Sequence, residues 1–471
     1  MEENSLLLRI IPNEVLLVIS DNLETTDINA FSQTCRRLAN ILIPVLCRIA
    51  CKHRNFRLPP ICWAAQKGYI NVVKRLIDMG CNTTGLQHYC DRCQLPHTST
   101  VLHWAAKGEN AELVNFLLDR GENIDAVDNR NATPLHWVCS EGGIEVVKLL
   151  VSRGADLEIE DCDGDTALRW AAERSNAPVF KLLLDSGCSK KQLNLKSETV
   201  LHTIFLHGEE DLEKHACVVK MLLEHGFDLL RHRDQFGDTA LHLAAKFGDV
   251  ESMKLMLDHG IPVDWHGPPN SPAPTHNSPA LNYAIESGKL EAIELLLQRG
   301  ANPDSTPTIP LDLAVEYGRI PVIELLIKYG ANVHCRNNNG DTVLHWAVQT
   351  TQVGVLDYFL QRPELGLDVN VQNRHLITPL HRACFMDPDP NWEIVDLLLR
   401  QENIQVDLQD DYGRTALINA SETGAVRLIE ALISKGADVN ICDHQGNSAL
   451  HKARDPRAWQ VLKAAGAKVY E

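Results

Sequence analysis

The sequence has no excess of basic residues. Its 471 residues include 62 acidic and 45 basic side chains, which gives a formal net charge of −17. Binding to the backbone of a nucleic acid needs clustered lysine and arginine, so this charge argues against nucleic acid as a partner. An acidic surface favours solubility and also suits a basic partner.

Signals for export, membrane insertion and disulfide scaffolds are missing as well. The first residues, Met1-Glu2-Glu3-Asn4, lack the basic n-region of a secretory signal peptide. No apolar run approaches the roughly 18 residues that span a bilayer. The 14 cysteines are scattered and not paired as in a small secreted domain. We therefore expect reduced thiols, a cytoplasmic and/or nuclear location, and no membrane partner.

Catalytic signatures are also missing. The chain has no Gly-rich phosphate loop, no Gly-x-Ser-x-Gly elbow and no His-Glu-x-x-His pair. We expect a protein that is not an enzyme and that needs no cofactor. An enzymatic function is kept open only by the cysteine-containing insertion described below.

One tetrapeptide, by contrast, is abundant. Variants of Thr133-Pro134-Leu135-His136 recur about every 33 residues as far as the C-terminus. Self-similarity at a fixed period indicates a solenoid in place of several globular domains. The clear copies end at His103, His136, His202, His242, His345, His381 and His451, and the weaker copies end at Cys62, Arg169, Asn282, Asp312 and Ile418.

Residues 128–160 show what one repeat is expected to form. Thr133 is placed to cap a helix, and Pro134 suits its first turn. A second helix follows with an apolar face over 144–150, and Gly154 is placed to end it in a left-handed conformation. The same glycine lies 18 residues after the last tetrapeptide position in eight repeats: Gly80, Gly121, Gly154, Gly187, Gly260, Gly300, Gly330 and Gly436.

These features resemble the ankyrin repeat, and the match covers about 58–467, or about 12 repeats. The resemblance implies a helix-turn-helix unit plus a β-hairpin loop. It also implies that the tetrapeptide histidines bond to the neighbouring loop backbone. A metal role for them is unfavourable, because stacked helices lie about 8–10 Å apart and a zinc ligand must lie about 2 Å from the ion.

Four insertions break the period, near 81–98, 208–217, 261–279 and 361–375. The second is acidic and is expected to lengthen a loop or a helix. The third is rich in proline and predicts an extended loop. In the fourth region we expect the helices to persist and the loops to stretch.

The first insertion holds a Cys-x-x-Cys with further cysteine and histidine nearby. Zinc takes four sulfur or nitrogen ligands in a tetrahedron, so a zinc site is one interpretation. An unstructured surface insertion is the other. The candidate ligands are Cys81, His88, Cys90, Cys93 and His97.

Residues 6–52 do not fit the period and predict three short amphipathic helices. Pro12 and Glu14 suit the start of the first helix. Apolar residues at steps of three and four mark the second, from Ile28 onwards. Such a small unit needs a neighbour or a partner to complete its core.

This segment resembles an F-box, with Ile11 in place of the usual leucine and without the tryptophan common near the end of animal F-boxes. The sequence Arg36-Arg37-Leu38 before a proline-broken apolar stretch is similar to the filamentous-fungal form, which often precedes ankyrin repeats. The resemblance therefore implies an all-α chain: a small three-helix F-box-like domain followed by an α-solenoid of ankyrin repeats.

The resemblance further implies a non-catalytic role in which the F-box docks the Skp-type adaptor of a cullin–RING ubiquitin ligase and the repeats bind a target protein. The alternative is an ankyrin scaffold or transcriptional co-regulator, in which the N-terminal helices are only a cap. The implied adaptor-binding residues are Pro12, Glu14, Val15, Leu16, Ile19, Leu23, Ile28, Phe31 and Leu38.

Ankyrin-type recognition uses the hairpin tips and the first helices, which implies where a target binds. Exposed aromatic side chains at turns are frequent binding hot spots, so Phe236 and Tyr412 are the sharpest candidates. The candidate target-binding residues are Arg130, Phe236, Asn338, Tyr412 and His444.

Overall fold

The computed structural model describes residues 59–468, except 79, 90–95, 190–192, 208–211, 228–231, 265–277, 307 and 386–390. The predicted F-box-like segment, 6–52, lies outside the described residues. The chain divides into two compact units, Met1–Ala240 and Leu241–Glu471. Among the described residues, no helix has both the length and the apolar character needed to cross a bilayer.

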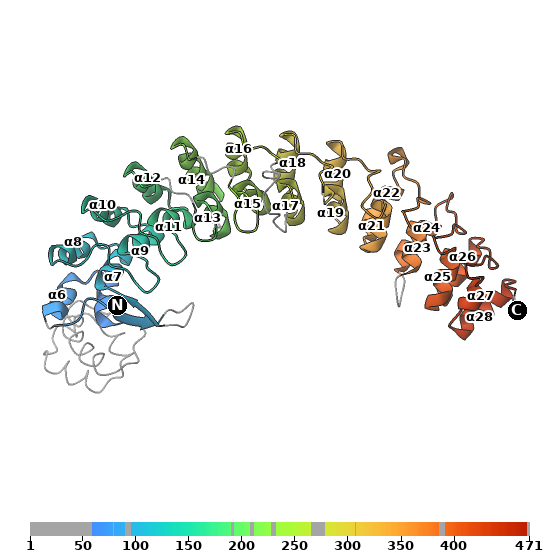
Figure 1. The fold of residues 1–471 in the computed structure, drawn as a ribbon, viewed down its shortest axis with the longest axis horizontal. Coiled ribbons are helices and arrows are strands. Elements are labelled where there is room, and N and C mark those ends of the chain that lie inside the picture. The colour runs from blue at the N-terminus through green and yellow to red at the C-terminus, as the bar shows by residue number, and fades with distance from the viewer. Residues whose placement is uncertain are drawn as a thin grey trace, which may run out of the picture. The chain divides into compact units, whose positions relative to one another are not determined.

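Helices in the first unit come in pairs, one pair to a repeat. The first helices of the pairs stack on one another, and so do the second helices, which gives the two rows visible in Figure 1. The first helices are α5 (Pro60–Gln66), α7 (Val101–Lys107), α9 (Pro134–Glu141), α11 (Ala167–Glu173) and α13 (Val200–His207). The second helices are α6 (Ile70–Asp78), α8 (Ala111–Asp119), α10 (Ile144–Ser152), α12 (Ala177–Asp185) and α14 (Leu212–Glu224).

The second unit continues the same alternation from α15, which begins at the last residue of the first unit. Its first helices are α15 (Ala240–Phe247), α17 (Ala280–Ser287), α19 (Pro310–Glu316), α21 (Val343–Gln349), α23 (Pro379–Cys384), α25 (Ala416–Thr423) and α27 (Ala449–Lys452). Its second helices are α16 (Val250–Asp258), α18 (Leu290–Gln298), α20 (Ile320–Lys328), α22 (Val353–Leu360), α24 (Trp392–Leu399), α26 (Val426–Ser434) and α28 (Pro456–Ala464).

The predicted start and end signals of a repeat are confirmed. Thr133 has an extended backbone, and its hydroxyl accepts a hydrogen bond from the backbone N–H of His136 at 3.5 Å. Pro134 opens α9 at a position where its missing N–H costs nothing. Gly154 has a φ of 85°, and a Cβ there would meet nothing within 4 Å. The left-handed conformation, and not crowding, is therefore what requires glycine.

Packing between repeats depends on a few fully buried aliphatic side chains in each. In the repeat of 128–160, Leu135 is 1% exposed, while Val138 and Val146 are fully buried. Neither helix buries this face alone, so each repeat is completed by its neighbours.

The insertions differ in the structure that they form. The acidic one lengthens a helix, since α14 has 13 residues where its neighbour α12 has nine. The fourth region keeps its helices, as expected, and its loop holds the short 3-10 helix η1 (Pro363–Leu365). Most of the proline-rich insertion lies outside the described residues.

The expectation that the first insertion is unstructured is wrong where it is described. Strand β1 (Leu86–Tyr89) pairs antiparallel with β2 (Pro96–Ser99), and residue 88 faces residue 97 across the ladder. The two strands satisfy each other's backbone groups, which explains why this stretch is regular.

Candidate protein-interaction surface

In eight of the described hairpin turns, one acidic or amide side chain holds the turn. The Oδ1 atom of Asp128 accepts hydrogen bonds from the backbone N–H groups of Arg130 at 2.8 Å and Ala132 at 2.9 Å. This is the local bonding that makes Asp and Asn favourable in turns. The same pair of bonds is made by Asp161, Asn194, Asp234, Asn337, Asn373, Asp410 and Asp443.

The tetrapeptide histidine joins its own repeat to the next one. Nδ1 of His136 accepts the backbone N–H of Thr133 at 3.1 Å, so the ring proton lies on Nε2. Nε2 then donates to the backbone oxygen of Asp165, at 3.1 Å, in the following hairpin. The same Nε2 contact with the next hairpin is made by His103, His202, His242, His345 and His381. The predicted structural role is confirmed for these residues.

Burial keeps four of these imidazoles neutral. Loss of water around the ring lowers the pKa of His136, His202 and His381 below the usual histidine value, and it lowers the pKa of His345 to about 4. A neutral ring is what the geometry needs, since Nδ1 must accept while Nε2 donates.

Backbone hydrogen bonds connect neighbouring hairpin tips in the first unit. The N–H of Cys162 donates to the oxygen of Arg130 at 2.7 Å. The next two steps are Leu195 to Asp163 at 3.1 Å and Gln235 to Lys196 at 3.2 Å. The tips therefore form one continuous edge, along which side chains from successive repeats stand side by side.

The second unit has a matching edge. The N–H of Arg374 donates to the oxygen of Asn339 at 3.0 Å. His444 donates in the same way to Tyr412 at 3.0 Å. The two edges carry all five of the predicted target-binding side chains, and their binding to a target stays a prediction.

In the first unit, Phe236 lies on this edge with 55% of its surface exposed. Arg130 is also exposed, and its Nη2 pairs with the carboxylate of Asp163 at 3.1 Å. Lys196 reaches the same carboxylate at 3.7 Å. Two cations from neighbouring tips therefore share one anion on this edge.

In the second unit, Tyr412 is 64% exposed, and Asn338 and His444 are exposed as well. The guanidinium of Arg414 lies 4.8 Å from the ring centre of Tyr412 and 4.9 Å from that of Phe385. Nη2 of Arg414 also pairs with the fully buried carboxylate of Asp410 at 2.9 Å. The rings of Tyr412 and Phe385 therefore lie against a guanidinium whose position is fixed by Asp410.

Sequence reasoning missed two tips. Leu195 is 77% exposed beside Phe236, although leucine at a turn has no packing reason to be there. His375 is exposed, and its Nδ1 lies 3.0 Å from the carboxylate of Asp411. Both tips follow an asparagine that stands five residues before the tetrapeptide threonine, and that fixed offset is the signal that would have found them.

Comparison with known proteins agrees with this geometry. The family model "Ankyrin repeats (3 copies)" matches seven segments, from 28–128 to 380–467. The chain belongs to the ankyrin-repeat family. A second model, "F-box domain", matches residues 8–43. This ankyrin-repeat protein therefore carries an F-box ahead of its solenoid, and both modules are non-catalytic interaction domains.

Curated relatives resemble this ankyrin-repeat protein only over a few repeats. The Caenorhabditis elegans homolog of "Transient receptor potential cation channel subfamily A member 1" is 32% identical over 24% of this chain and 8% of its own length. The Homo sapiens channel of that name is 31% identical over 26% and 10%. "Neurogenic locus notch homolog protein 1" of Mus musculus is 35% identical over 25% and 4%.

Among solved structures, the ankyrin repeat domain of Bcl-3, "a unique member of the IkappaB protein family", aligns with a TM-score of 0.42 and 26% identity. It covers 48% of this chain and 99% of that domain. The chain spans a tenth or less of the curated relatives cited above, so their activities are not carried over.

The predicted adaptor-binding residues, from Pro12 to Leu38, all fall within the F-box match but outside the described residues. Of the zinc candidates, Cys90 and Cys93 also lie outside them. Among all the residues that the structure describes, no three or more His, Cys, Asp or Glu side chains form a group that could hold a metal ion. Zinc binding stays a prediction, and elemental analysis of the purified protein decides it.

Proposed function

We propose that this ankyrin-repeat protein is the substrate-recognition subunit of an SCF-type cullin–RING ubiquitin ligase. Its F-box docks the Skp-type adaptor, and its repeats hold the target. The observation that carries the proposal is the F-box match at residues 8–43 in front of the repeats. This role needs no catalytic group on the chain, and it belongs in the cytoplasm or the nucleus, where reduced cysteines persist.

The geometry of the hairpin edges supports target binding by the repeats. In the first unit, Leu195 and Phe236 expose apolar surface on neighbouring tips that are joined through Lys196. In the second unit, Tyr412 and Phe385 flank Arg414. Aromatic and arginine side chains dominate binding hot spots, and a rigid edge lowers the entropy cost of binding.

The adaptor half of the proposal is tested by pull-down with a purified Skp-type adaptor. The wild-type chain should bind it, while Pro12→Asp and Leu16→Asp should not, because a carboxylate would be buried in an apolar interface. Tyr412→Ala is the matched control, since it alters the repeat edge only and should leave adaptor binding intact.

The scaffold or co-regulator alternative gives the opposite result. A wild-type chain that never binds the adaptor, or whose binding survives both F-box substitutions, would favour it. The F-box-like helices would then serve only as the cap that the first repeat requires.

A further inference from the structure

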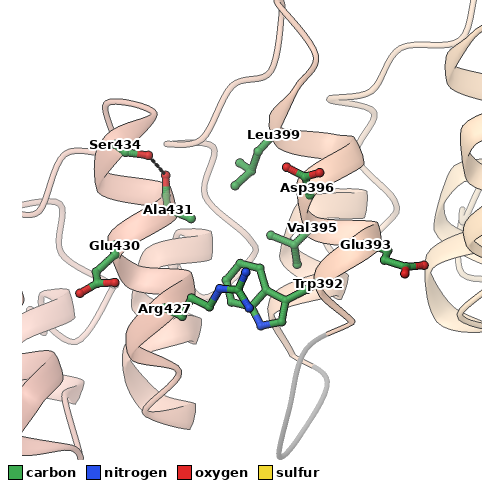
Figure 2. A pocket seen from close by; sticks show the side chains of 9 residues that line it. All are labelled: Trp392, Glu393, Val395, Asp396, Leu399, Arg427, Glu430, Ala431 and Ser434. Atoms are coloured by element: carbon green, nitrogen blue, oxygen red, sulfur yellow. Dashed lines mark hydrogen bonds between the residues drawn. The ribbon is translucent and has the colours of Figure 1, made fainter.

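A groove opens between two second helices of the second unit, α24 and α26. It has a volume of about 610 Å³. Val395 and Leu399 of α24 and Ala431 of α26 supply its apolar part. Figure 2 shows Arg427 from α26 lying over the indole of Trp392 from α24, with their centres 4.1 Å apart.

In earlier steps of this unit an ion pair crosses the space between neighbouring second helices, and among the described residues none crosses it between α24 and α26. The fifth residue of α18, Glu294, pairs with the ninth residue of α20, Lys328, at 3.2 Å. In the next step Glu324, the fifth residue of α20, pairs with Arg362 at 3.2 Å. A long basic side chain thus fills the space between neighbouring second helices.

In α24 the fifth residue is again acidic, Asp396, but the ninth residue of α26 is Ser434. The serine hydroxyl donates to the backbone oxygen of Ala431 at 2.7 Å and does not reach across, as Figure 2 shows. Asp396 pairs with Arg400 of its own repeat at 2.5 Å. The position of Lys328 in α20 is thus taken by a short side chain in α26, and the next residue, Lys435, makes no ion pair among the described residues.

Charge makes the groove selective. Three carboxylates line it, Glu393 and Asp396 on one wall and Glu430 on the other. Arg427 is the cation of the lining, and Asp396 is already paired with Arg400. Among the described residues, no ion pair includes Glu393 or Glu430. The ninth residue of α28, where a partner for Glu430 is expected, is Ala464.

We propose that this groove docks a short basic segment of a partner protein, with an arginine of that segment in the space that Lys328 fills between α18 and α20. The aliphatic part of the arginine lies along Val395 and Leu399. Its guanidinium lies among the carboxylates, beside an indole that already accepts a guanidinium on one face. The site is separate from the hairpin edge and does not depend on a ligase role.

The probe is a fluorescein-labelled peptide of repeated arginine-leucine-alanine, titrated with the full-length chain and followed by fluorescence anisotropy. A peptide with glutamate in place of arginine is the control for the probe. Hydrogen–deuterium exchange with the bound peptide should show protection over α24 and α26. Binding of both peptides, no binding of either, or protection only elsewhere overturns the proposal.

Two substitutions test the site, each with a matched control. Ser434→Arg places a base at the position that Lys328 has in α20, and it should weaken binding about tenfold while leaving the melting temperature unchanged or higher. Ser152→Arg is its control, because Ser152 is the ninth residue of α10 and donates to Leu149 in the same way. Glu393→Lys, at the second residue of α24, should weaken binding about fivefold. Its control is Glu291→Lys, at the second residue of α18, which should leave binding unchanged.

The controls separate the groove from the general acidity of the chain. If all four variants lose affinity equally, the peptide binds the overall negative charge and the proposal fails. If Ser434→Arg does not fold, the comparison of peptide affinity between Glu393→Lys and Glu291→Lys still shows whether the peptide binds in the groove.

Discussion

Arg169 stands where seven repeats carry histidine, and its Nη2 donates to the backbone oxygen of Glu198 at 2.5 Å. Its Nη1 also donates to Thr203 at 3.0 Å, and its Nε lies 3.2 Å from the carboxylate of Asp165. In another repeat, Asn282 donates to the oxygen of Thr308 at 3.0 Å. Arginine and asparagine can therefore replace imidazole as the donor to the next hairpin, although other repeats carry Cys62, Asp312 and Ile418 at this position.

Removing the donor at Arg169 should lower the free energy of unfolding, because this side chain is only 3% exposed. Arg169→Ala leaves the half-buried Asp165 without its cation and should lower the free energy of unfolding by about 3 kcal/mol. Arg169→His restores the usual donor and should recover most of that loss. Chemical denaturation followed by circular dichroism measures both, and equal losses in the two variants would contradict this account of the joint.

The neutral histidines make stability depend on pH. Burial lowers the pKa of His345 from 6.5 to about 4, so between these values the unfolded chain binds the proton that the folded chain excludes. The contribution of His345 is complete above pH 6.5 and is lost as the pH falls towards 4, by about 1 kcal/mol per unit.

His345→Asn tests this dependence, because asparagine keeps a donor, as Asn282 does, but does not titrate. Its free energy of unfolding should fall less than that of the wild type when the pH drops from 6.5 to 4. Denaturant midpoints at matched pH values give the comparison. A constant difference between the two proteins across that range would show that His345 does not titrate on unfolding.

The tetrapeptide leucine is the main packing residue of each repeat. Leu241 is 1% exposed, and Leu241→Ala should cost about 2–5 kcal/mol through lost contacts and the cavity left behind. Leu290 is 40% exposed at the start of α18, so Leu290→Ala should cost much less. Thermal melting of the two variants provides the measurement, and similar shifts would contradict the assigned core.

Sequence periodicity was enough to place the helix pairs, because the threonine cap, the buried leucine and the left-handed glycine recur at fixed offsets. It missed the tip at Leu195, where asparagine replaces the aspartate of most turns. It also missed the strands within 81–98, which are too short for a pattern of alternation. The groove at Ser434 depends on a contact between repeats, which one repeat's own sequence does not contain.

Tyr412 provides the sharpest test of the hairpin edge. Its ring rests on Arg414, which Asp410 holds independently, so Tyr412→Ala should leave the melting temperature unchanged. Target capture should weaken about thirtyfold, as expected when an aromatic hot spot worth roughly 2 kcal/mol is lost.

The measurement is quantitative affinity purification of cellular proteins with wild-type and Tyr412→Ala chains, with the Skp-type adaptor as internal reference. Gln445→Ala, at the equivalent position of the adjacent exposed tip, is the control for general disturbance of the edge. Specific loss of one set of proteins by Tyr412→Ala, with adaptor recovery unchanged, locates target binding on this edge. If the recovered proteins are the same for all three chains, the second unit's edge does not recognise the target, and the Leu195 and Phe236 tips of the first unit become the surface to alter.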